Sequence, residues 1–375
     1  MKSAHITRLR LTDFRGYGAL DLDVDARPVA IYGPNGAGKT NILEAISFLA
    51  PGKGLRGADT EAVVRHEGDM AAPAWAVFAE ASGARGALTL AAGARLGARR
   101  QTRLDGSPVS RAALARAFPM LALQPEEDRL FAGPRAERLK FFDGLVSAAA
   151  PEHGEALNAY DKLRRQRQKL LEDGRADPTW LDAIETDMAA HGVAIAAARL
   201  DALSRLQAEI DAAPDTAFPK AGLALDGATE ADLAAGMKSG AAEDALQNRL
   251  REGRDRDGAS GRSLSLGPHR TDLTARHTGK DRPAGECSTG EQKALVVRLA
   301  LAQARVLARA TGAAPLLLLD EACAHLDADR RAGLAEAISG LGAQAWLTGV
   351  ERGLFNAFDG RAQMFEVIAG QVTPR

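Results

Sequence analysis

The alternation of apolar and polar residues predicts extended structure in the first part of the chain. Three apolar residues alternate with three aspartates over residues 20–25, a period of two that is typical of a strand with one face in solvent. Residues 29–32 form a short apolar run that ends at Gly33, which predicts a buried strand. Residues 75–91 show the pattern of a β-meander.

Helical spacing begins after a glycine-rich segment. Apolar residues recur three and four positions apart over residues 42–49, and Pro51-Gly52 ends the predicted helix. From about residue 135 to residue 255 the chain is rich in alanine and in charge, again with helical spacing. A single helix over residues 180–212 would be roughly 50 Å long. Since no heptad pattern is sustained over many turns, we predict a compact helical lobe rather than a long coiled coil.

Strands and helices alternate again towards the end of the chain. The charged and glycine-rich residues 249–261 predict an exposed linker, and apolar runs predict strands at residues 314–319 and 345–348. We therefore predict an α/β fold in which both end segments form one lobe around an inserted helical lobe, with segments 1–130, 131–261 and 262–375.

Composition narrows the class of protein. Hydrophobic residues make up 46% and charged residues 26% of the 375 residues, which is the composition of a globular protein with a substantial core. Only 5% are aromatic, so we expect a core of leucine, valine, isoleucine and alanine. The formal net charge of −1 excludes a protein that coats nucleic acid through bulk charge, but it is compatible with a local basic face.

The cysteines and the apolar runs indicate the compartment. Cys287 and Cys323 form no CxxC pattern, so we expect neither a disulfide framework nor a thiolate zinc site. The first residues contain no apolar signal region, and no apolar run approaches the ~20 residues that span a bilayer. We therefore expect a soluble, cytoplasmic protein without a membrane segment.

A complete P-loop motif follows the buried strand. The pattern G-x-x-x-x-G-K-[ST] is matched by Gly33, Pro34, Asn35, Gly36, Ala37, Gly38, Lys39 and Thr40. Glycines here let backbone N–H groups turn towards phosphate oxygens, and the following helix presents its N-terminus to the same anion. We expect Lys39 to reach the β- and γ-phosphates of ATP and the Thr40 hydroxyl to bind Mg²⁺. The strand before the motif and the helix after it argue against a chance glycine-rich turn.

The apolar residues 316–319 lead into two carboxylates, Asp320 and Glu321. A buried strand that ends in two acids is common by itself, but a P-loop in the same chain gives these acids a role. We expect Asp320 to hold Mg²⁺ with Thr40 or through a water, and Glu321 to polarise the attacking water as general base. Because most of the chain separates them from Lys39, we predict a large insertion between two halves of one site.

Ser288 and Glu291 stand at the start of a strongly apolar helical pattern. One interpretation is an ordinary capping box, which has this S-x-x-E spacing. The other is a second phosphate site, because an exposed helix N-terminus attracts anions. Both interpretations stay open on these residues alone.

The order of these motifs resembles the ABC-type ATPase heads of the SMC group. The P-loop is followed by a helical insertion, by Ser-Thr-Gly-Glu-Gln-Lys at residues 288–293, by the strand ending at Glu321, and by His325-Leu326-Asp327. More closely, the chain resembles the RecF family of bacterial recombination-repair ATPases. Three further segments carry this resemblance at both ends of the chain, namely residues 13–17 (DFRGY), 41–46 (NILEAI) and 267–273 (GPHRTDL).

The resemblance implies an ABC-type P-loop ATPase head, a mixed sheet with helices, that carries the helical lobe as an insertion. It also implies that Ser288 and Gly290 contact the γ-phosphate held by the other subunit of an ATP-bound homodimer. Asp327 would be the D-loop aspartate at that dimer interface. Thr348 takes the switch position, where transporter ATPases usually carry histidine.

Two further residues have two interpretations each. Gln124 is either the Q-loop residue that senses Mg²⁺ and the γ-phosphate or a plain loop glutamine, since the family commonly has serine or threonine before Pro-Glu. Arg15 either approaches the phosphates or lies in solvent on an edge strand.

By the resemblance, ATP closes a homodimer on duplex DNA or at a single-strand/double-strand junction, and slow, DNA-stimulated hydrolysis reopens it. The protein would help RecR- and RecO-type partners to load recombinase in DNA repair, replication restart and the SOS response. One alternative is another SMC-like DNA clamp whose ATP site is only a switch. The other is a transporter-type ABC ATPase subunit, which the long insertion before residue 288 disfavours.

Three basic stretches are candidates for contact with DNA. Residues 162–169 contain five cations, residues 95–103 contain four arginines, and a sparse third stretch consists of Arg56, Arg65 and His66. The alternative for residues 162–169 is a solvated helix. Because none of the stretches is interleaved with aromatic residues, we expect salt-sensitive contact with duplex phosphates rather than base stacking.

Overall fold

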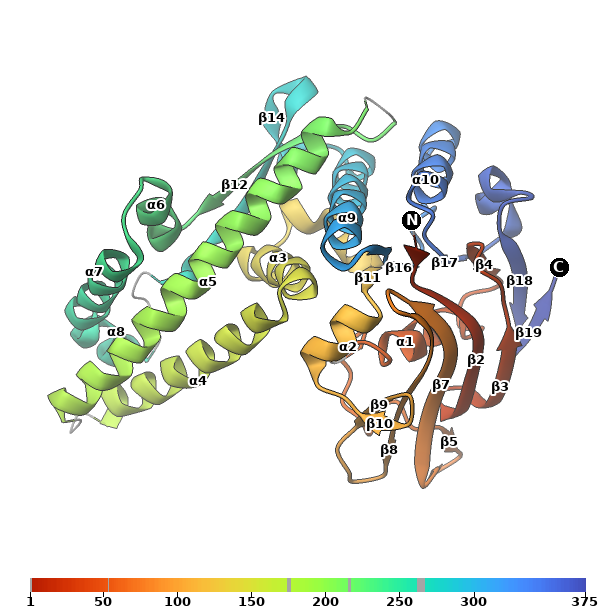
Figure 1. Cartoon of the computed structure of the whole chain (residues 1–375), viewed down its shortest axis with the longest axis horizontal. Helices are drawn as coiled ribbons and strands as arrows, with labels where there is room; N and C mark the ends of the chain where they lie inside the picture. Colours follow the sequence, from red (N-terminus) through yellow and green to blue (C-terminus); the bar gives the residue numbers. More distant parts are fainter. Residues whose placement is uncertain (1, 53, 174–176, 215–216, 262–266) are drawn as a thin grey trace. The chain divides into compact units, whose positions relative to one another are not determined.

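The computed structural model describes the chain except for residues 1, 53, 174–176, 215–216 and 262–266 (Figure 1). Its internal contacts divide the chain into two compact units. Unit 1 comprises Met1–Arg129, Ala213–Lys220 and Ser288–Arg375, and unit 2 comprises Leu130–Ala212 and Ala221–Cys287.

This division differs in detail from the lobes expected from the sequence. We expected the segment from residue 262 to join the C-terminal half, but its described part up to Cys287 belongs to unit 2. The reason is strand pairing, because β13 (Asp272–His277) is antiparallel to β12 (Ala221–Asp226) and also pairs with β14 (Arg282–Pro283).

In one sheet of unit 1 the sequence motifs follow the carboxyl ends of the strands. Its strand order is β11-β16-β17-β4-β18-β19, and these strands are Met120–Leu123, Leu316–Leu319, Ala345–Gly349, Val29–Tyr32, Gln363–Ile368 and Gln371–Pro374. Neighbouring strands are parallel except for β18 and β19. Every residue of β4, β16 and β17 is buried, which explains their continuous apolar runs. Because the strands are parallel, the carboxyl ends of β11, β16, β17 and β4 lie at one edge.

The second large sheet of unit 1 is antiparallel. Its order is β10-β9-β8-β7-β2-β3, formed by Ser107–Pro108, Gln101–Leu104, Gly86–Arg95, Ala74–Gly83, His5–Phe14 and Tyr17–Asp23. The β7–β8 hairpin confirms the predicted meander, and the exposed aspartates of β3 confirm the alternating pattern. Unit 1 also contains three short pairings. β1 (Lys2–Ser3) pairs with β15 (Ala313–Ala314), β5 (His66–Glu67) pairs with β6 (Met70–Ala71), and Phe14 forms a single bridge with Val64.

The helices of unit 1 pack on these sheets. They are α1 (Lys39–Ser47), α2 (Arg111–Ala117), α9 (Thr289–Thr311) and α10 (Ala328–Leu341), with a 3₁₀ segment, η5 (Arg352–Phe358). One hydrophobic core includes side chains from both large sheets and from α1. Within it Phe14, Phe48 and Trp75 meet edge to face, with ring centroids 5.2–5.7 Å apart.

Unit 2 is mainly helical, as predicted. Its helices are α3 (Arg135–Ala149), α4 (Pro151–Asp173), α5 (Pro178–Ala212), α6 (Ala228–Ala234), α7 (Ser239–Glu252) and α8 (Arg254–Ser260). The 35 residues of α5 confirm the long helix, and α4 packs along it (Figure 1). The core of these helices includes α7 as well, and buries Tyr160, Ile184, Met188, Leu246 and Leu250.

The prediction of a linker over residues 249–261 is wrong, although Arg251, Glu252, Asp255 and Arg256 are exposed as expected. The segment forms the end of α7 and all of α8, and Asp257 is fully buried. Two of its charged side chains are paired inside unit 2. Asp257 lies 2.7 Å from Arg167, which also lies 2.8 Å from Glu185, and Arg254 lies 2.5 Å from Glu185. Charged residues therefore form part of this core because each one has an ion-pair partner.

Within the described ranges, no helix combines the length and the apolar character that are needed to cross a membrane.

Candidate functional site

The P-loop connects the buried strand β4 to helix α1. Gly33 has φ 151°, and a side chain there would place its Cβ 2.1 Å from the carbonyl oxygen of Val367. Gly38 has φ 107° and caps α1 without a side-chain hydrogen bond, and a Cβ there would lie 2.8 Å from the Tyr17 hydroxyl. Only glycine fits both positions, and the helix N-terminus is left uncapped by any side chain, as a phosphate site requires.

Lys39 lies inside the loop. Its Nζ donates to the carbonyl oxygens of Gly33 at 2.7 Å and Pro34 at 2.9 Å, and the residue is buried. Burial lowers the pKa of Lys39, although the nearby Asp320 and Glu321 act in the opposite direction. A cation held this way, against carbonyls and away from water, is available to phosphate oxygens that enter the loop.

The adjacent parallel strands bring Thr40, Asp320 and Thr348 into direct contact. Thr40 Oγ1 lies 3.1 Å from Asp320 Oδ1, and Thr348 Oγ1 donates to the same carboxylate oxygen at 2.5 Å. Asp320 follows β16 and Thr348 lies in β17, both buried. Burial raises the pKa of Asp320, and the two hydroxyl hydrogen bonds counteract this effect. Residues that are far apart in the sequence thus form one polar cluster beside the P-loop.

Glu321 has an unusual backbone, with φ 52°. Its N–H donates to Thr348 Oγ1 at 2.9 Å, and its carbonyl oxygen accepts from Lys293 Nζ at 2.9 Å. The main chain of this residue is therefore held from both sides in this conformation.

Lys293 is a site residue to which the sequence motifs assigned no role. It lies in α9 with its side chain 1% exposed, and its Nζ is 2.8 Å from Asp128 Oδ2 as well as bonded to Glu321. Burial raises the pKa of Asp128, and Lys293 counteracts this effect. The signal that could have identified it is a lysine within the mainly apolar helical run over residues 292–302, in which Arg298 is the other cation.

Gln124 directly follows β11, which pairs with β16, so it lies at the same strand edge as Asp320. Its N–H donates to Glu127 Oε2 at 2.8 Å, and Asp320 N–H donates to the carbonyl of Leu123 at 3.0 Å. This position agrees with the Q-loop interpretation.

Ser288, Gly290 and Asp327 form a second cluster. Ser288 caps α9 with a complete capping box that includes Glu291, so the ordinary interpretation is correct for the structure of the helix. Asp327 caps α10, and Arg330 donates to the carbonyl of Gly290 at 3.4 Å while lying 3.7 Å from Asp327. Ser288 and Asp327 are exposed, so a partner molecule can reach them.

Arg15 is paired within the protein rather than solvated, and its contact with the phosphates stays a prediction. Its guanidinium donates to Glu44 at 2.7 and 2.9 Å and to the carbonyl of Ala62 at 2.6 Å. Glu44 is completely buried on α1, so its charge needs this partner. Arg15 therefore anchors the helix that follows the P-loop.

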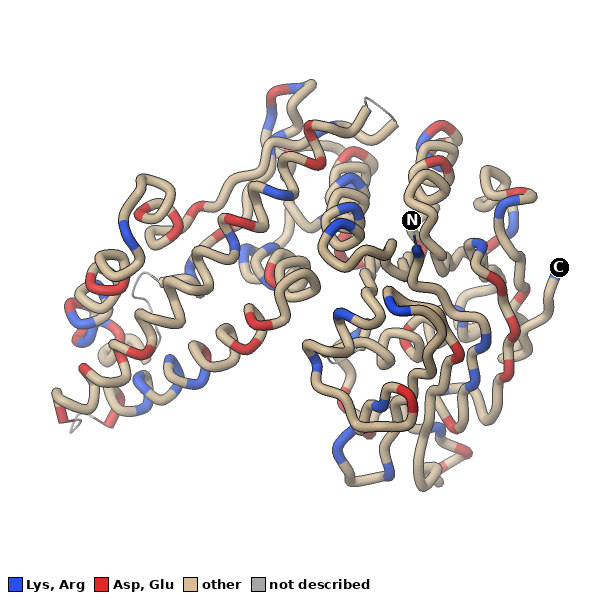
Figure 2. The backbone as a smooth tube through the Cα atoms, viewed as in Figure 1, with Lys and Arg blue, Asp and Glu red and all other residues tan. Residues whose placement is uncertain are grey.

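The basic stretch on α4 is less available than the sequence suggested. Figure 2 shows Lys and Arg gathered on α4 and on the β8–β9 hairpin. Arg167 is fully buried, and Arg164 and Arg165 lie 2.6 and 3.1 Å from Asp161. Lys162 and Lys169 are exposed. In the third stretch, Arg65 lies 3.7 Å from Asp13 and Arg56 lies 3.9 Å from Glu44.

The residues at the strand edge fit a magnesium–nucleotide complex. The Thr40 hydroxyl and the Asp320 carboxylate are hard oxygen donors, and Mg²⁺ in such sites takes one or two protein ligands and completes its shell with phosphates and water. The described part of the chain contains no cluster of three or more His, Cys, Asp or Glu residues able to hold a metal by itself. The arrangement thus suits a metal that arrives with a phosphate ligand.

Comparison with known proteins gives two kinds of likeness. The family model for the RecF/RecN/SMC N terminal domain matches residues 5–373. The chain is 48% identical to the "DNA replication and repair protein RecF" of Caulobacter sp. (strain K31), covering 96% of each chain. It is 44% identical to the protein of the same name from Rhizobium meliloti (strain 1021), covering 98% of each.

Among solved structures, the chain is similar to one described as the recombination mediator protein RecF-ATPrS in the RecFOR pathway. The TM-score is 0.86 at 21% identity, covering 100% of this chain and 98% of that one. A Smc head domain from Pyrococcus furiosus, bound to the C-terminal domain of ScpA, matches with a TM-score of 0.54 at 16% identity, covering 99% and 96%. At these identities the likeness concerns the fold, which is that of an ABC-type ATPase head.

Proposed function

The chain belongs to the RecF family of ABC-type ATPase heads, and from this premise we propose that it is an ATP-driven DNA-binding protein of replication and recombinational repair. The observation that carries the proposal is the 3.1 Å contact between Thr40 of the P-loop and Asp320 after β16. It joins the two halves of a nucleotide site that are separated by most of the chain.

ATP binds at the P-loop. Backbone N–H groups of Asn35, Gly36 and Gly38 surround the phosphates. Those of Gly33 and Ala37 donate to the carbonyls of Gly349 and Pro34 and so shape the turn. Lys39 exchanges its two carbonyl partners for β- and γ-phosphate oxygens. Thr40 and Asp320 hold Mg²⁺, which when bound neutralises charge on the β- and γ-phosphates. The uncapped N-terminus of α1 supports this anion site.

Hydrolysis depends on Glu321 as general base for the attacking water. Thr348 orients the reaction centre from β17, since its hydroxyl joins the Asp320 carboxylate to the Glu321 backbone. Gln124 senses the nucleotide from the end of β11. Turnover is slow and is stimulated by DNA, because the energy of ATP binding is used mainly to close a dimer.

The cluster of Ser288, Gly290 and Asp327, in which Ser288 and Asp327 are exposed, completes the site of a second subunit. In the closed homodimer Ser288 and Gly290 contact the γ-phosphate of the partner, and Asp327 lies at the interface. Exposure of Ser288 at a helix N-terminus supports this role. The dimer closes on duplex DNA or at a single-strand/double-strand junction and works with RecR- and RecO-type partners, as the RecFOR description of the similar structure suggests.

The proposal is tested by measuring ATP binding, gapped-duplex binding and phosphate release on the full chain. Wild type should bind DNA when ATP is present and release phosphate faster with DNA. Glu321→Gln should keep both binding activities and lose turnover, whereas Lys39→Ala should lose ATP binding. Lys140→Gln is the control, since this lysine side chain is 80% exposed in unit 2. Equal phosphate release by wild type and Glu321→Gln would refute the role of Glu321 as general base. Wild type that binds no DNA in any nucleotide state would refute the proposed function.

A further inference from the structure

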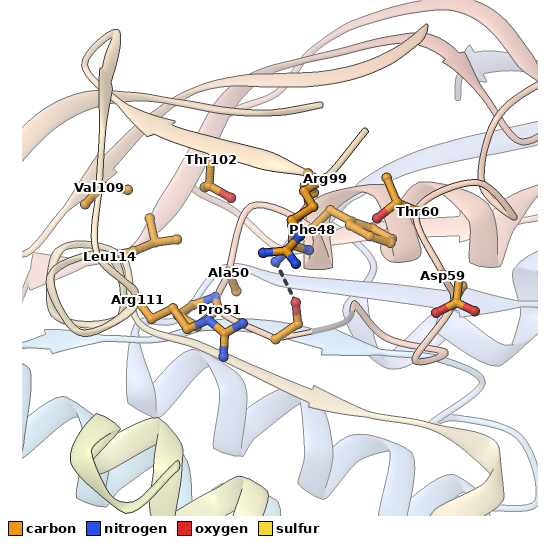
Figure 3. A pocket seen from close by; sticks show the side chains of 13 residues that line it. Phe48, Ala50, Pro51, Asp59, Thr60, Arg99, Thr102, Val109, Arg111 and Leu114 are labelled. Atoms are coloured by element: carbon orange, nitrogen blue, oxygen red, sulfur yellow. Dashed lines mark hydrogen bonds between the residues drawn. The ribbon is translucent and has the colours of Figure 1, made fainter. Parts of the chain in front are cut away.

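A cavity of about 380 Å³ lies in unit 1 beside the end of α1 (Figure 3). Phe48, Pro51 and Gly52 form one side of it, and the other side comes from the β8–β9 hairpin and α2. Three arginines line it, Arg99, Arg100 and Arg111, and none of the P-loop residues does. It is therefore a site separate from the nucleotide site.

Arg100 is held in place at this cavity. Its guanidinium lies over the Phe48 ring at 5.1 Å and donates to the carbonyl of Gly52 at 2.5 Å. Burial lowers the pKa of Arg100, and the positive charge of Arg111 lowers it further. The guanidinium thus has a fixed position, although a like charge stands near it.

Within the described residues, the arginines of the cavity have no acidic partner. Asp59 is the one acid that lines the cavity, and among the described residues no ion pair joins it or any other carboxylate to Arg99, Arg100 or Arg111. Elsewhere in unit 1 a partly buried arginine, Arg15, is paired with a carboxylate. A cluster of arginines kept together without an acid partner is arranged for an external anion.

Phosphate is the anion that fits this arrangement. Guanidinium groups present planar N–H pairs that match two phosphate oxygens, and two arginines from different elements can hold one group from both sides. Pro51 and Val109, both partly exposed, offer an apolar surface for the sugar or base attached to the phosphate. A concave site of this kind holds a single phosphate more closely than a flat basic face does.

We propose that the cavity lined by Arg99, Arg100 and Arg111 binds a phosphate group of the DNA on which the protein acts, an inference that rests on the proposed function. The phosphate is either the 5′-terminal monoester of a strand at a gap or a diester of the duplex backbone. These two sources share one recognition chemistry, and they differ in whether a strand end is required.

The test measures the affinity of the full chain for fluorescein-labelled gapped duplex by anisotropy, with ATP and Mg²⁺, at several salt concentrations. The DNA carries either a 5′-phosphate or a 5′-hydroxyl at the gap. Arg111→Gln and Arg100→Gln are compared with Arg116→Gln, a control on the same helix as Arg111 and likewise exposed. Titration with a fluorescent ATP analogue checks that the P-loop site is intact in each variant.

We expect both cavity variants to bind DNA roughly tenfold more weakly, and the slope of log K against log salt to fall by about 0.9 for each phosphate that the variant no longer neutralises. Arg116→Gln should stay within about twofold of wild type. A preference of wild type for the 5′-phosphate that both cavity variants lack identifies the monoester, and equal binding of the two DNAs identifies the backbone.

Because Arg111 is exposed, its variant stays informative even if Arg100→Gln does not fold. Wild-type affinity and an unchanged salt slope in Arg111→Gln would overturn the inference and leave the proposed function standing. Failure of wild type to bind DNA would overturn both.

Discussion

Replacement of Lys293 by methionine tests whether the buried lysine of α9 fixes the strand edge that carries Asp320 and Glu321. The change keeps the volume of the side chain but removes its charge and both donor contacts, to Asp128 at 2.8 Å and to the Glu321 carbonyl at 2.9 Å. Lys293 is 1% exposed and Asp128 is 17% exposed, so the pair is buried rather than superficial.

The expected loss of stability follows from these contacts. Removing one partner of a buried ion pair costs about 3–5 kcal/mol, since the other charge stays uncompensated. Here the cost is lower, about 2–3 kcal/mol, because the Asp128 side chain is 17% exposed and keeps part of its hydration. Removing Asp128 as well, in Lys293→Met/Asp128→Leu, should restore about 1–2 kcal/mol relative to the sum of the single variants.

Urea unfolding followed by tryptophan fluorescence measures this in unit 1 alone. The chain has three tryptophans, of which Trp75 and Trp346 are buried in unit 1 and Trp180 is 51% exposed in unit 2. In a Trp180→Phe background the signal therefore reports unit 1. Arg116→Gln on the exposed face of α2 is the control, and it should change stability by less than about 0.5 kcal/mol.

Activity supplies an independent readout. Because Lys293 holds the main chain of Glu321, Lys293→Met should reduce ATP turnover roughly tenfold while ATP affinity changes little. A loss of less than about 1 kcal/mol, together with additive effects in the double variant, would refute the role assigned to this pair.

Three further changes test other parts of the molecule. Thr348→Val removes the hydroxyl that donates to Asp320 at 2.5 Å, and phosphate release should fall roughly tenfold, with recovery in Thr348→Ser; unchanged turnover would contradict this. Arg167→Met should lower the free energy of unfolding of unit 2 by about 3–5 kcal/mol by circular dichroism, whereas the exposed Lys169→Gln on the same helix should be neutral. Burial raises the pKa of the Cys323 thiol from 9.0 to about 12. In a variant in which Cys323 is the one cysteine left, Ellman's reagent at pH 8 should therefore react with the folded protein far more slowly than with the unfolded protein. Rapid labelling of the folded protein would refute the burial. Because the folded thiol keeps its proton, stability from this group is present below about pH 9 and is lost as the pH rises towards 12.

The nucleotide site was largely predictable from the sequence. The apolar runs of β4 and β16 identified two buried strands, and the polar residues that follow them had to meet once the strands were parallel. The contact between Thr40 and Asp320 is the direct result. Local signals suffice here because each motif contains both the apolar residues of its strand and the polar residues that follow the strand.

The ionic interior was not predictable for the opposite reason. Arg15 pairs with Glu44 and Arg167 pairs with Asp257, partners that lie far along the chain. A run of charges has the same composition whether it is solvated or neutralised inside a core, so residues 249–261 resembled a linker. The same limit applied to Lys293, whose two partners come from other segments.

At Ser288 the two interpretations are compatible rather than exclusive. The hydroxyl caps α9 within one chain, and the nucleotide contact that we propose for Ser288 would be made to a second subunit. The S-x-x-E spacing predicts the helix cap from the sequence alone, but a sequence gives no geometry for a contact between two subunits.

The central claim, that ATP closes two copies of this chain on DNA, is tested most directly by sedimentation velocity with ATP and gapped duplex. The account predicts dimers of wild type only when ATP is present, more of them with DNA, and monomers of Ser288→Arg under every condition although this variant still binds ATP. Wild type that stays monomeric with ATP and DNA, or Ser288→Arg that dimerises like wild type, would contradict it.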